Sequence, residues 1–133
     1  MENEKLIELM KKITDERDHI AFSQIFDFIA PKINAYFLKN NLNLQQSEEL
    51  TQEVLSTVWI KASLFNPLKS KFITWSFTIA RNKKIDLYRK TKKNNLNKDD
   101  LRYFLYENNT HNDYEIESSV KKITQELDEN QQK

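Results

Sequence analysis

The segment with the clearest chemical character is residues 69–93, which hold nine lysines or arginines and a single acid, Asp86. Its net charge is +8, whereas the rest of the chain carries 12 basic and 19 acidic residues, a net of −7. The formal charge of +1 for the whole chain hides this contrast. A concentrated block of cations predicts a surface that binds a polyanion. Lysines are also common at solvent-exposed helix ends that bind nothing, and for residues 90–93 taken alone this explanation is favoured.

Read as a helix, the same segment presents cations, an aromatic ring and an amide along one face. At 100° per residue that face contains Lys71, Trp75, Thr78, Asn82, Asp86, Arg89 and Lys93. Rings stack on unpaired bases while cations follow the phosphates, so the face suits single-stranded or melted nucleic acid. The side-chain amide of Asn82 can bind the edge of an adenine through two hydrogen bonds. Two alternatives stay open, namely Trp75 at the edge of the core and Asn82 as a solvated residue. Asp86 is expected to pair within the helix with Lys83 or Lys90.

A second predicted helix presents an acidic and amide face. That face consists of Glu49, Gln52, Glu53 and Ser56, with Ile60 extending it and Trp59 at its edge. Acids and amides flanked by large apolar groups suit a helix-on-helix contact with a basic protein. The alternative is an ordinary solvent-exposed helix face that binds no partner. Glu48, Glu49 and Glu53 are oxygen ligands of the kind that hold divalent metals, but no further carboxylate or histidine stands at matching spacing, so no metal site is predicted.

Composition excludes most catalytic chemistry. The chain has no cysteine and two histidines, so thiol catalysis, disulfides, Cys-type zinc sites and a His-based triad lack their residues. Glycine is absent, which removes the Gly-rich phosphate loops. The sequence contains no signal peptide and no run of about 18 apolar residues, so a cytoplasmic protein without membrane insertion is expected. We expect no catalytic residue, no cofactor and no metal.

The elements that must position these faces are helices. Two prolines and no glycine leave few tight β-turns, and apolar residues recur at helical spacing, which predicts an all-α bundle of three to four main helices over residues 1–93. The pattern places helices over 3–14, over 22–37, over 44–62 and over 70–92. Pro31 is expected to bend the second of these or to remove one of its main-chain hydrogen bonds. Asn43 and Gln46 have the spacing of a capping box, and Asn66-Pro67 signals a turn. The buried stripe of the last helix is expected to be Ile73, Phe77, Ala80 and Leu87.

Five groups of residues follow one another at characteristic spacings. They are Ala21-Phe22 with Phe26; Glu48 to Val54 with Trp59 and Lys61-Ala62; Phe65-Asn66-Pro67; Phe72 to Trp75; and Phe77 to Asn82 with Asp86 and Arg89-Lys90. In this order they resemble region 2 of bacterial sigma factors, especially the small extracytoplasmic-function (ECF) type. The resemblance covers roughly residues 18–93, and many independent positions agree.

The resemblance implies a helical domain that binds RNA polymerase core and recognises the promoter −10 element and its unwound non-template strand. In the family, an Asp-Leu-x-Gln-Glu-type segment docks on the coiled coil of the β′ subunit's clamp, and it maps to Glu49, Leu50, Gln52 and Glu53. The strand-binding loop and helix map to residues 65–89. The residues assigned to DNA are Lys71, Trp75, Thr78, Arg81, Asn82, Lys83, Arg89 and Lys90. The family further implies an anti-sigma factor as a partner.

Three positions depart from the family pattern. Ser70-Lys71 stands where many relatives have Gly-Ser, which leaves the conformation of the loop open. Thr78-Ile79 replaces the tryptophan pair of housekeeping sigma factors, which favours the ECF type. Glu49 stands where Asp is frequent.

The C-terminal part is expected to hold a polar linker and one more helix. Residues 94–115 are rich in asparagine and polar. Ile116, Val120, Ile123 and Leu127 have helical spacing, which predicts a helix within 116–133. This helix resembles the start of region 4, the domain whose helix-turn-helix reads the −35 element in complete members. The expectation is a chain cut just inside region 4, with a natural single-domain protein as the alternative.

Two other functions stay open beside the transcription-initiation factor. One is a helical adaptor that binds only protein, in which Glu49 to Glu53 matter and the basic helix does not. The other is a metal-dependent nuclease that uses Glu48, Glu49 and Glu53. Binding of a −10 oligonucleotide with and without polymerase core separates the first from the main hypothesis, and cleavage assays with Mg²⁺ test the second.

Overall fold

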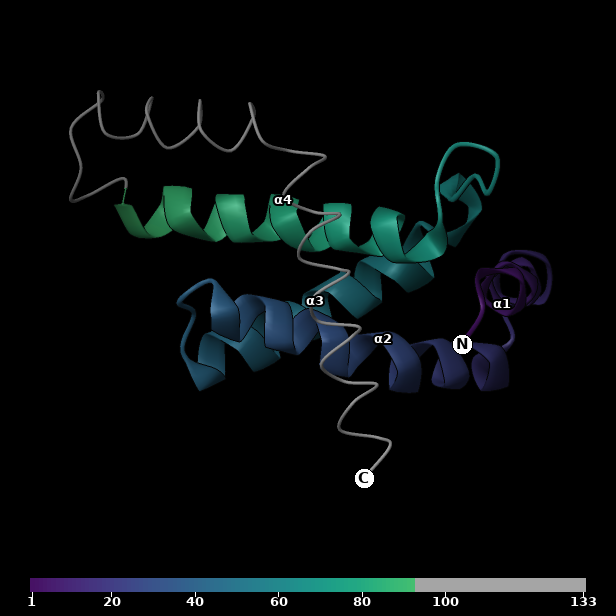
Figure 1. The fold of residues 1–133 in the computed structure, drawn as a ribbon, viewed down its shortest axis with the longest axis horizontal. Coiled ribbons are helices and arrows are strands. Elements are labelled where there is room, and N and C mark those ends of the chain that lie inside the picture. Colours follow the sequence, from purple (N-terminus) through teal and green to yellow (C-terminus); the bar gives the residue numbers. More distant parts are fainter. Residues whose placement is uncertain (93–133) are drawn as a thin grey trace.

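The computed structural model describes residues 1–92, which fold into helices joined by short connections (Figure 1). Along this part of the chain the elements are α1 (Asn3–Glu16), α2 (His19–Lys39), α3 (Leu44–Ile60), the 3-10 turn η1 (Ala62–Leu64) and α4 (Phe72–Lys92). These residues form no β-strand, which confirms the all-α prediction. The predicted linker over 94–115 and helix within 116–133 lie outside the described residues. Across residues 1–92, no helix combines the length and apolar character needed to span a bilayer.

Side chains cap the starts of α2 and α3. Asp18 Oδ1 accepts hydrogen bonds from the main-chain N–H groups of Ile20 and Ala21 at 2.9 and 3.1 Å. The predicted capping box is confirmed, because Asn43 Oδ1 accepts from Gln46 N at 2.8 Å and Gln46 Oε1 accepts from Asn43 N at 3.1 Å. These bonds use main-chain donors that have no partner inside the helix, and so they fix where each helix begins.

Removing the cap of α3 gives a first prediction. Asn43→Ala is expected to lower the free energy of unfolding by about 1 kcal/mol, because the N–H of Gln46 loses its acceptor. Asn43→Asp keeps an acceptor oxygen at that place and is expected to retain nearly the stability of the wild type. Urea denaturation followed by circular dichroism measures both variants. Equal stability of Asn43→Ala and the wild type would contradict the cap.

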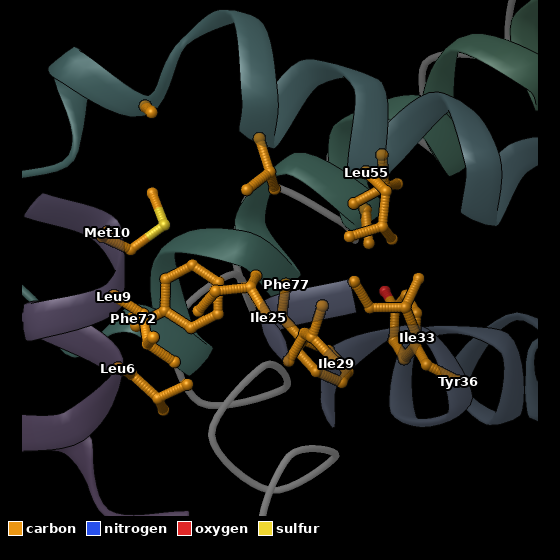
Figure 2. Close-up of a cluster of buried hydrophobic side chains, with 14 of the residues drawn as sticks. Leu6, Leu9, Met10, Ile25, Ile29, Ile33, Tyr36, Leu55, Phe72 and Phe77 are labelled. Atoms are coloured by element: carbon orange, nitrogen blue, oxygen red, sulfur yellow. The ribbon is translucent and has the colours of Figure 1, made fainter. Parts of the chain in front are cut away.

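The core forms where the apolar stripes of the helices meet. On α2 the stripe consists of Ile25, Ile29, Ile33 and Phe37, each 0% exposed. Figure 2 shows the α2 side chains Ile25, Ile29, Ile33 and Tyr36 together with Leu6, Leu9 and Met10 of α1, Leu55 of α3, and Phe72 and Phe77 of α4. α2 contacts α1, α3 and α4, and its contacts with α1 and α3 are the most extensive between helices. Pro31 lies inside α2, and the helix continues past it to Lys39.

The buried stripe of α4 differs from the predicted one. Phe77 and Ala80 are buried as predicted, but Ile73 and Leu87 are only half-buried. The buried positions of α4 are Phe72, Ser76, Phe77, Ala80, Arg81, Lys84 and Ile85. The stripe therefore includes polar and charged residues, which a search for apolar periodicity does not find.

Candidate nucleic-acid and protein-binding faces

The outward face of α4 carries most of the residues that the sequence assigned to DNA. Asn82, Arg89 and Lys90 are exposed, and Lys83 is half-buried beside them. Lys71 is exposed at the position before the helix begins. The face thus contains an amide near the middle of the helix and cations around it, the arrangement that the helical spacing predicted.

Trp75 and Thr78 lie on the same face but are half-buried. The Trp75 ring packs on Phe65 and Phe72, with ring centroids 5.3 and 6.1 Å apart. The Thr78 hydroxyl donates to the carbonyl of Thr74 at 2.9 Å. Trp75 therefore lies at the edge of the core, which was one of the two alternatives for this residue. Its remaining exposed surface is the part that a base would contact.

Two cations of the basic segment point inward. Arg81 and Lys84 are each 3% exposed. Lys84 Nζ donates to Asn40 Oδ1 at 3.1 Å and lies 5.1 Å from the centroid of the Tyr36 ring. The assignment of Arg81 to DNA does not fit this burial, so its side chain is left out of the DNA-binding face. The count of nine cations overstates the basic surface, since charge counting does not tell inward from outward positions.

Asp86 pairs with a different residue from the ones expected. Its Oδ1 lies 4.0 Å from Arg89 Nη1, and both side chains are more than half exposed. Lys83 and Lys90 were the predicted partners. A surface pair of this kind contributes little to stability, so Arg89 stays available to a phosphate.

The loop before α4 exposes two leucines that the sequence analysis did not single out. Leu64 is 68% exposed and Leu68 is 94% exposed. The predicted turn at Asn66-Pro67 is present, because Asn66 Oδ1 accepts from Leu68 N at 2.9 Å. A leucine on each side of the Asn66-Pro67 turn signal, followed by Lys69 and Lys71, is the sequence pattern that could have predicted these exposed leucines.

The outward face of α3 matches the predicted acidic face. Glu49, Gln52, Glu53 and Ser56 are exposed, and Ile60 extends the face with 70% of its surface exposed. Leu50, which the sequence assigned to polymerase binding, is 7% exposed and packs in the core beneath this face. A partner would therefore meet the carboxylates and the amide, while Leu50 holds the helix in place from below. Glu48 is exposed as well, and residues 1–92 contain no cluster of three histidine or acidic side chains arranged to hold a metal ion.

A groove of about 250 Å³ separates the two faces. Its walls are Gln46, Glu49, Leu50 and Glu53 from α3, and Lys83, Asp86, Leu87 and Lys90 from α4. The acidic face of α3 and the basic face of α4 thus share one border. Sequence reasoning placed the two faces on separate helices and did not predict that they adjoin.

Trp59 is held by Arg17 in the turn between α1 and α2 and by two rings at the start of α2. Arg17 Nη1 donates to the Trp59 carbonyl at 2.9 Å, and the guanidinium carbon lies 4.0 Å from the centroid of the indole ring. The rings of His19 and Phe22 pack on the same indole, with centroids 4.9 and 5.1 Å away. Trp59 is therefore half-buried by its neighbours, and it closes the end of α3 rather than offering a free aromatic surface.

Known proteins similar to this chain are bacterial sigma factors. Residues 33–94 match the family model of sigma-70 region 2. The chain is 45% identical over 84 residues to the ECF RNA polymerase sigma factor RpoE of Cereibacter sphaeroides, a match that covers 63% of this chain and 46% of that protein. It is 29% identical over 72 residues to the ECF RNA polymerase sigma factor SigK of Mycobacterium tuberculosis, covering 54% of this chain and 38% of that protein.

A solved structure agrees with these sequence matches. The fold resembles Rhodobacter sphaeroides SigE, crystallised in complex with the anti-sigma ChrR, with a TM-score of 0.58 and 41% sequence identity. That match covers 62% of this chain and 47% of the SigE chain, so the chain spans about half the length of the relatives it matches. Family model, sequence and fold agree: residues 33–94 match region 2 of the sigma-70 family, and the chain is similar in sequence to ECF sigma factors and in fold to SigE.

Proposed function

We propose that this chain directs transcription initiation by binding RNA polymerase core through α3 and the unwound non-template strand of the −10 element through α4. The observation that carries the proposal is the shared groove, which sets the exposed acidic face of α3 beside the exposed amide and cations of α4. One domain thereby offers one surface to a basic protein and an adjoining surface to a nucleic acid. The chemistry of RNA synthesis would belong to the polymerase, and the chain would act with it in the cytoplasm.

On the polymerase side, the proposed contacts are Glu49, Gln52 and Glu53. All three side chains are exposed, and together they offer two carboxylates and one amide along one side of α3. Such a surface is complementary to a basic helical partner, for which the coiled coil of the β′ clamp is the proposed candidate. Leu50 contributes through the packing of α3 rather than by direct contact, because only 7% of it is exposed.

On the DNA side, Asn82 is the proposed base reader, and Lys71, Lys83, Arg89 and Lys90 are the proposed phosphate contacts. An amide offers a donor and an acceptor at once, which is what discrimination between base edges requires. Lysines and arginines neutralise phosphates whatever the sequence, so they supply affinity rather than specificity. Thr78 and the exposed part of Trp75 lie on the same face as Asn82, and the indole is the proposed surface on which an unpaired base would stack.

An anti-sigma factor is a further proposed partner. The structural relative SigE was crystallised with the anti-sigma ChrR. A protein that covers the acidic face of α3 would compete with polymerase for the same carboxylates, and this is a direct way to keep such a factor inactive.

Binding of single-stranded DNA with and without polymerase core tests the proposal. A pool of random single-stranded oligonucleotides is incubated with the chain and bacterial RNA polymerase core, and the bound fraction is sequenced. We expect one short sequence to be enriched only when chain and core are both present. Core binding without any enriched sequence would favour the protein-only adaptor, and cleavage of the oligonucleotides in Mg²⁺ would favour the nuclease.

A further inference from the structure

Asparagine side chains from two other helices hydrogen-bond α4 near its two ends. At the first residue of α4, Phe72 N donates to Asn3 Oδ1 of α1 at 3.1 Å. In the second half of α4, Lys84 Nζ donates to Asn40 Oδ1 at 3.1 Å, and the Tyr88 hydroxyl donates to the main-chain oxygen of Asn40 at 2.7 Å. Asn40 follows the last residue of α2. The helix that carries the proposed base reader is thus held by both α1 and α2.

The bond from Asn3 compensates for a missing local cap. The first N–H groups of a helix have no partner within it, and the residue before the helix normally supplies an acceptor. In α4 that residue is Lys71, whose ammonium group has donors and no acceptor. Asn3, which is 69 positions away in the sequence, supplies the oxygen instead. The start of α4 is therefore defined by its position against α1.

The bonds from Asn40 hold the second half of α4, where Leu87 and Tyr88 are only partly buried against the core. The fully buried members of that core on α4 are Phe72, Phe77 and Ala80, all in its first half. Asn40 itself is held in one orientation, because its side-chain Nδ2 donates to the carbonyl of Tyr36 at 2.8 Å. Its Oδ1 is thereby directed at Lys84. Burial raises the pKa of the Tyr88 phenol above its ordinary value, so the hydroxyl remains a donor at neutral pH.

Rotation of α4 decides which residues meet the DNA. A shift of one residue along a helix moves a side chain by about 1.5 Å and turns it by about 100°. Such a shift would take Asn82 from the outward face to the flank of the helix and would replace it with a neighbour of different chemistry. Sequence-specific reading therefore depends on a fixed register of α4, whereas phosphate binding by several long, flexible cations does not.

We propose that Asn3 and Asn40 are positioning residues for DNA reading, which set the register of α4 against α1 and α2. This inference rests on the proposed function of α4. According to this inference, α1 contributes to sequence-specific DNA binding, although it precedes the residues that match the region 2 family model.

The test compares Asn3→Ala and Asn40→Ala with a matched asparagine variant. Each is bound, as the full chain with polymerase core, to the oligonucleotide enriched by the wild type and to a scrambled version of it. We expect the preference for the enriched sequence to fall about fivefold in each variant, the equivalent of one net hydrogen bond. Affinity for the scrambled strand and its salt dependence are expected to stay near the wild-type values. Asn3→Asp keeps the acceptor and is expected to restore the preference.

Asn43→Ala is the matched control, because it removes an asparagine cap whose hydrogen-bond partner is Gln46 of α3 rather than a residue of α4. It is expected to lower stability and leave the preference unchanged. A wild-type preference in both Asn3→Ala and Asn40→Ala would overturn the inference, as would an equal loss of preference in Asn43→Ala. A wild-type chain that enriches no sequence at all contradicts the proposed function itself, and that result does not depend on either asparagine.

Discussion

Phe77→Ala is expected to lower the free energy of unfolding by about 3–5 kcal/mol, a large part of the stability of a domain of this size. Phe77 is 1% exposed and lies in the cluster where α1, α2 and α4 meet. Its ring packs edge-on against Tyr36 of α2, with centroids 5.4 Å apart. Truncation removes both the buried apolar surface and this aromatic pair, and it leaves a cavity under the first half of α4. Urea denaturation monitored by circular dichroism measures the loss.

Phe26→Ala provides the control for this prediction. Phe26 is on α2, as Tyr36 is, but it is 38% exposed and has an edge-on contact with Phe22 at a centroid distance of 6.2 Å. The same chemical change is therefore expected to cost about 1 kcal/mol or less at this position. A similar loss for the two phenylalanines would contradict the position assigned to the core.

The second large effect is expected on polymerase binding. The double variant Gln52→Ala with Glu53→Lys should weaken binding to RNA polymerase core by about 1–3 kcal/mol, the scale of a few interface hot spots. The change removes an amide and reverses a charge on the face proposed to meet a basic partner. Both side chains are exposed, whereas Val54 and Val58 of the same helix are buried. The circular dichroism spectrum is therefore expected to match that of the wild type, and fluorescence anisotropy with labelled chain measures the affinity.

A variant with the same two changes elsewhere controls for charge alone. Gln24→Ala with Glu16→Lys alters exposed residues of α2 and α1, away from the groove, and is expected to bind core with wild-type affinity. Equal weakening by both double variants would mean that polymerase responds only to the net charge of the chain. Wild-type affinity of the Gln52→Ala with Glu53→Lys variant would show that this face of α3 does not contact polymerase.

Local signals in the sequence predicted the fold well where a capping or turn motif marks a boundary, whereas α2 begins three residues before its predicted start. Asn43 and Gln46 form the capping box that their spacing indicated, and Asn66 forms its turn. The apolar stripe of α2 recurs at helical spacing and is fully buried. Pro31 was predicted inside the same helix and lies there, within a helix that continues to Lys39.

The orientation of α4 was less predictable because polar contacts with distant residues set it. Periodicity selected Ile73 and Leu87 for the core, yet the structure leaves both half-buried and turns Lys84 inward. The partner of Lys84 is Asn40, 44 positions earlier, and nothing in the local sequence marks that pair. Arg81, which the sequence assigned to DNA, is buried as well. For Lys84, a hydrogen bond to a distant residue accompanies an inward orientation that local periodicity does not predict.

The measurement that tests the central claim most directly is the effect of Asn82→Ala on sequence preference. Binding of the enriched and the scrambled strand is measured with polymerase core at several salt concentrations, for Asn82→Ala and for Lys90→Ala. If α4 reads the strand, Asn82→Ala weakens the enriched strand by about 1–3 kcal/mol more than the scrambled one, with an unchanged salt slope. Lys90→Ala is expected to weaken both strands equally and to lower the salt slope by about 0.7. If Asn82→Ala instead weakens both strands equally or neither, α4 is an electrostatic surface and does not read the −10 element.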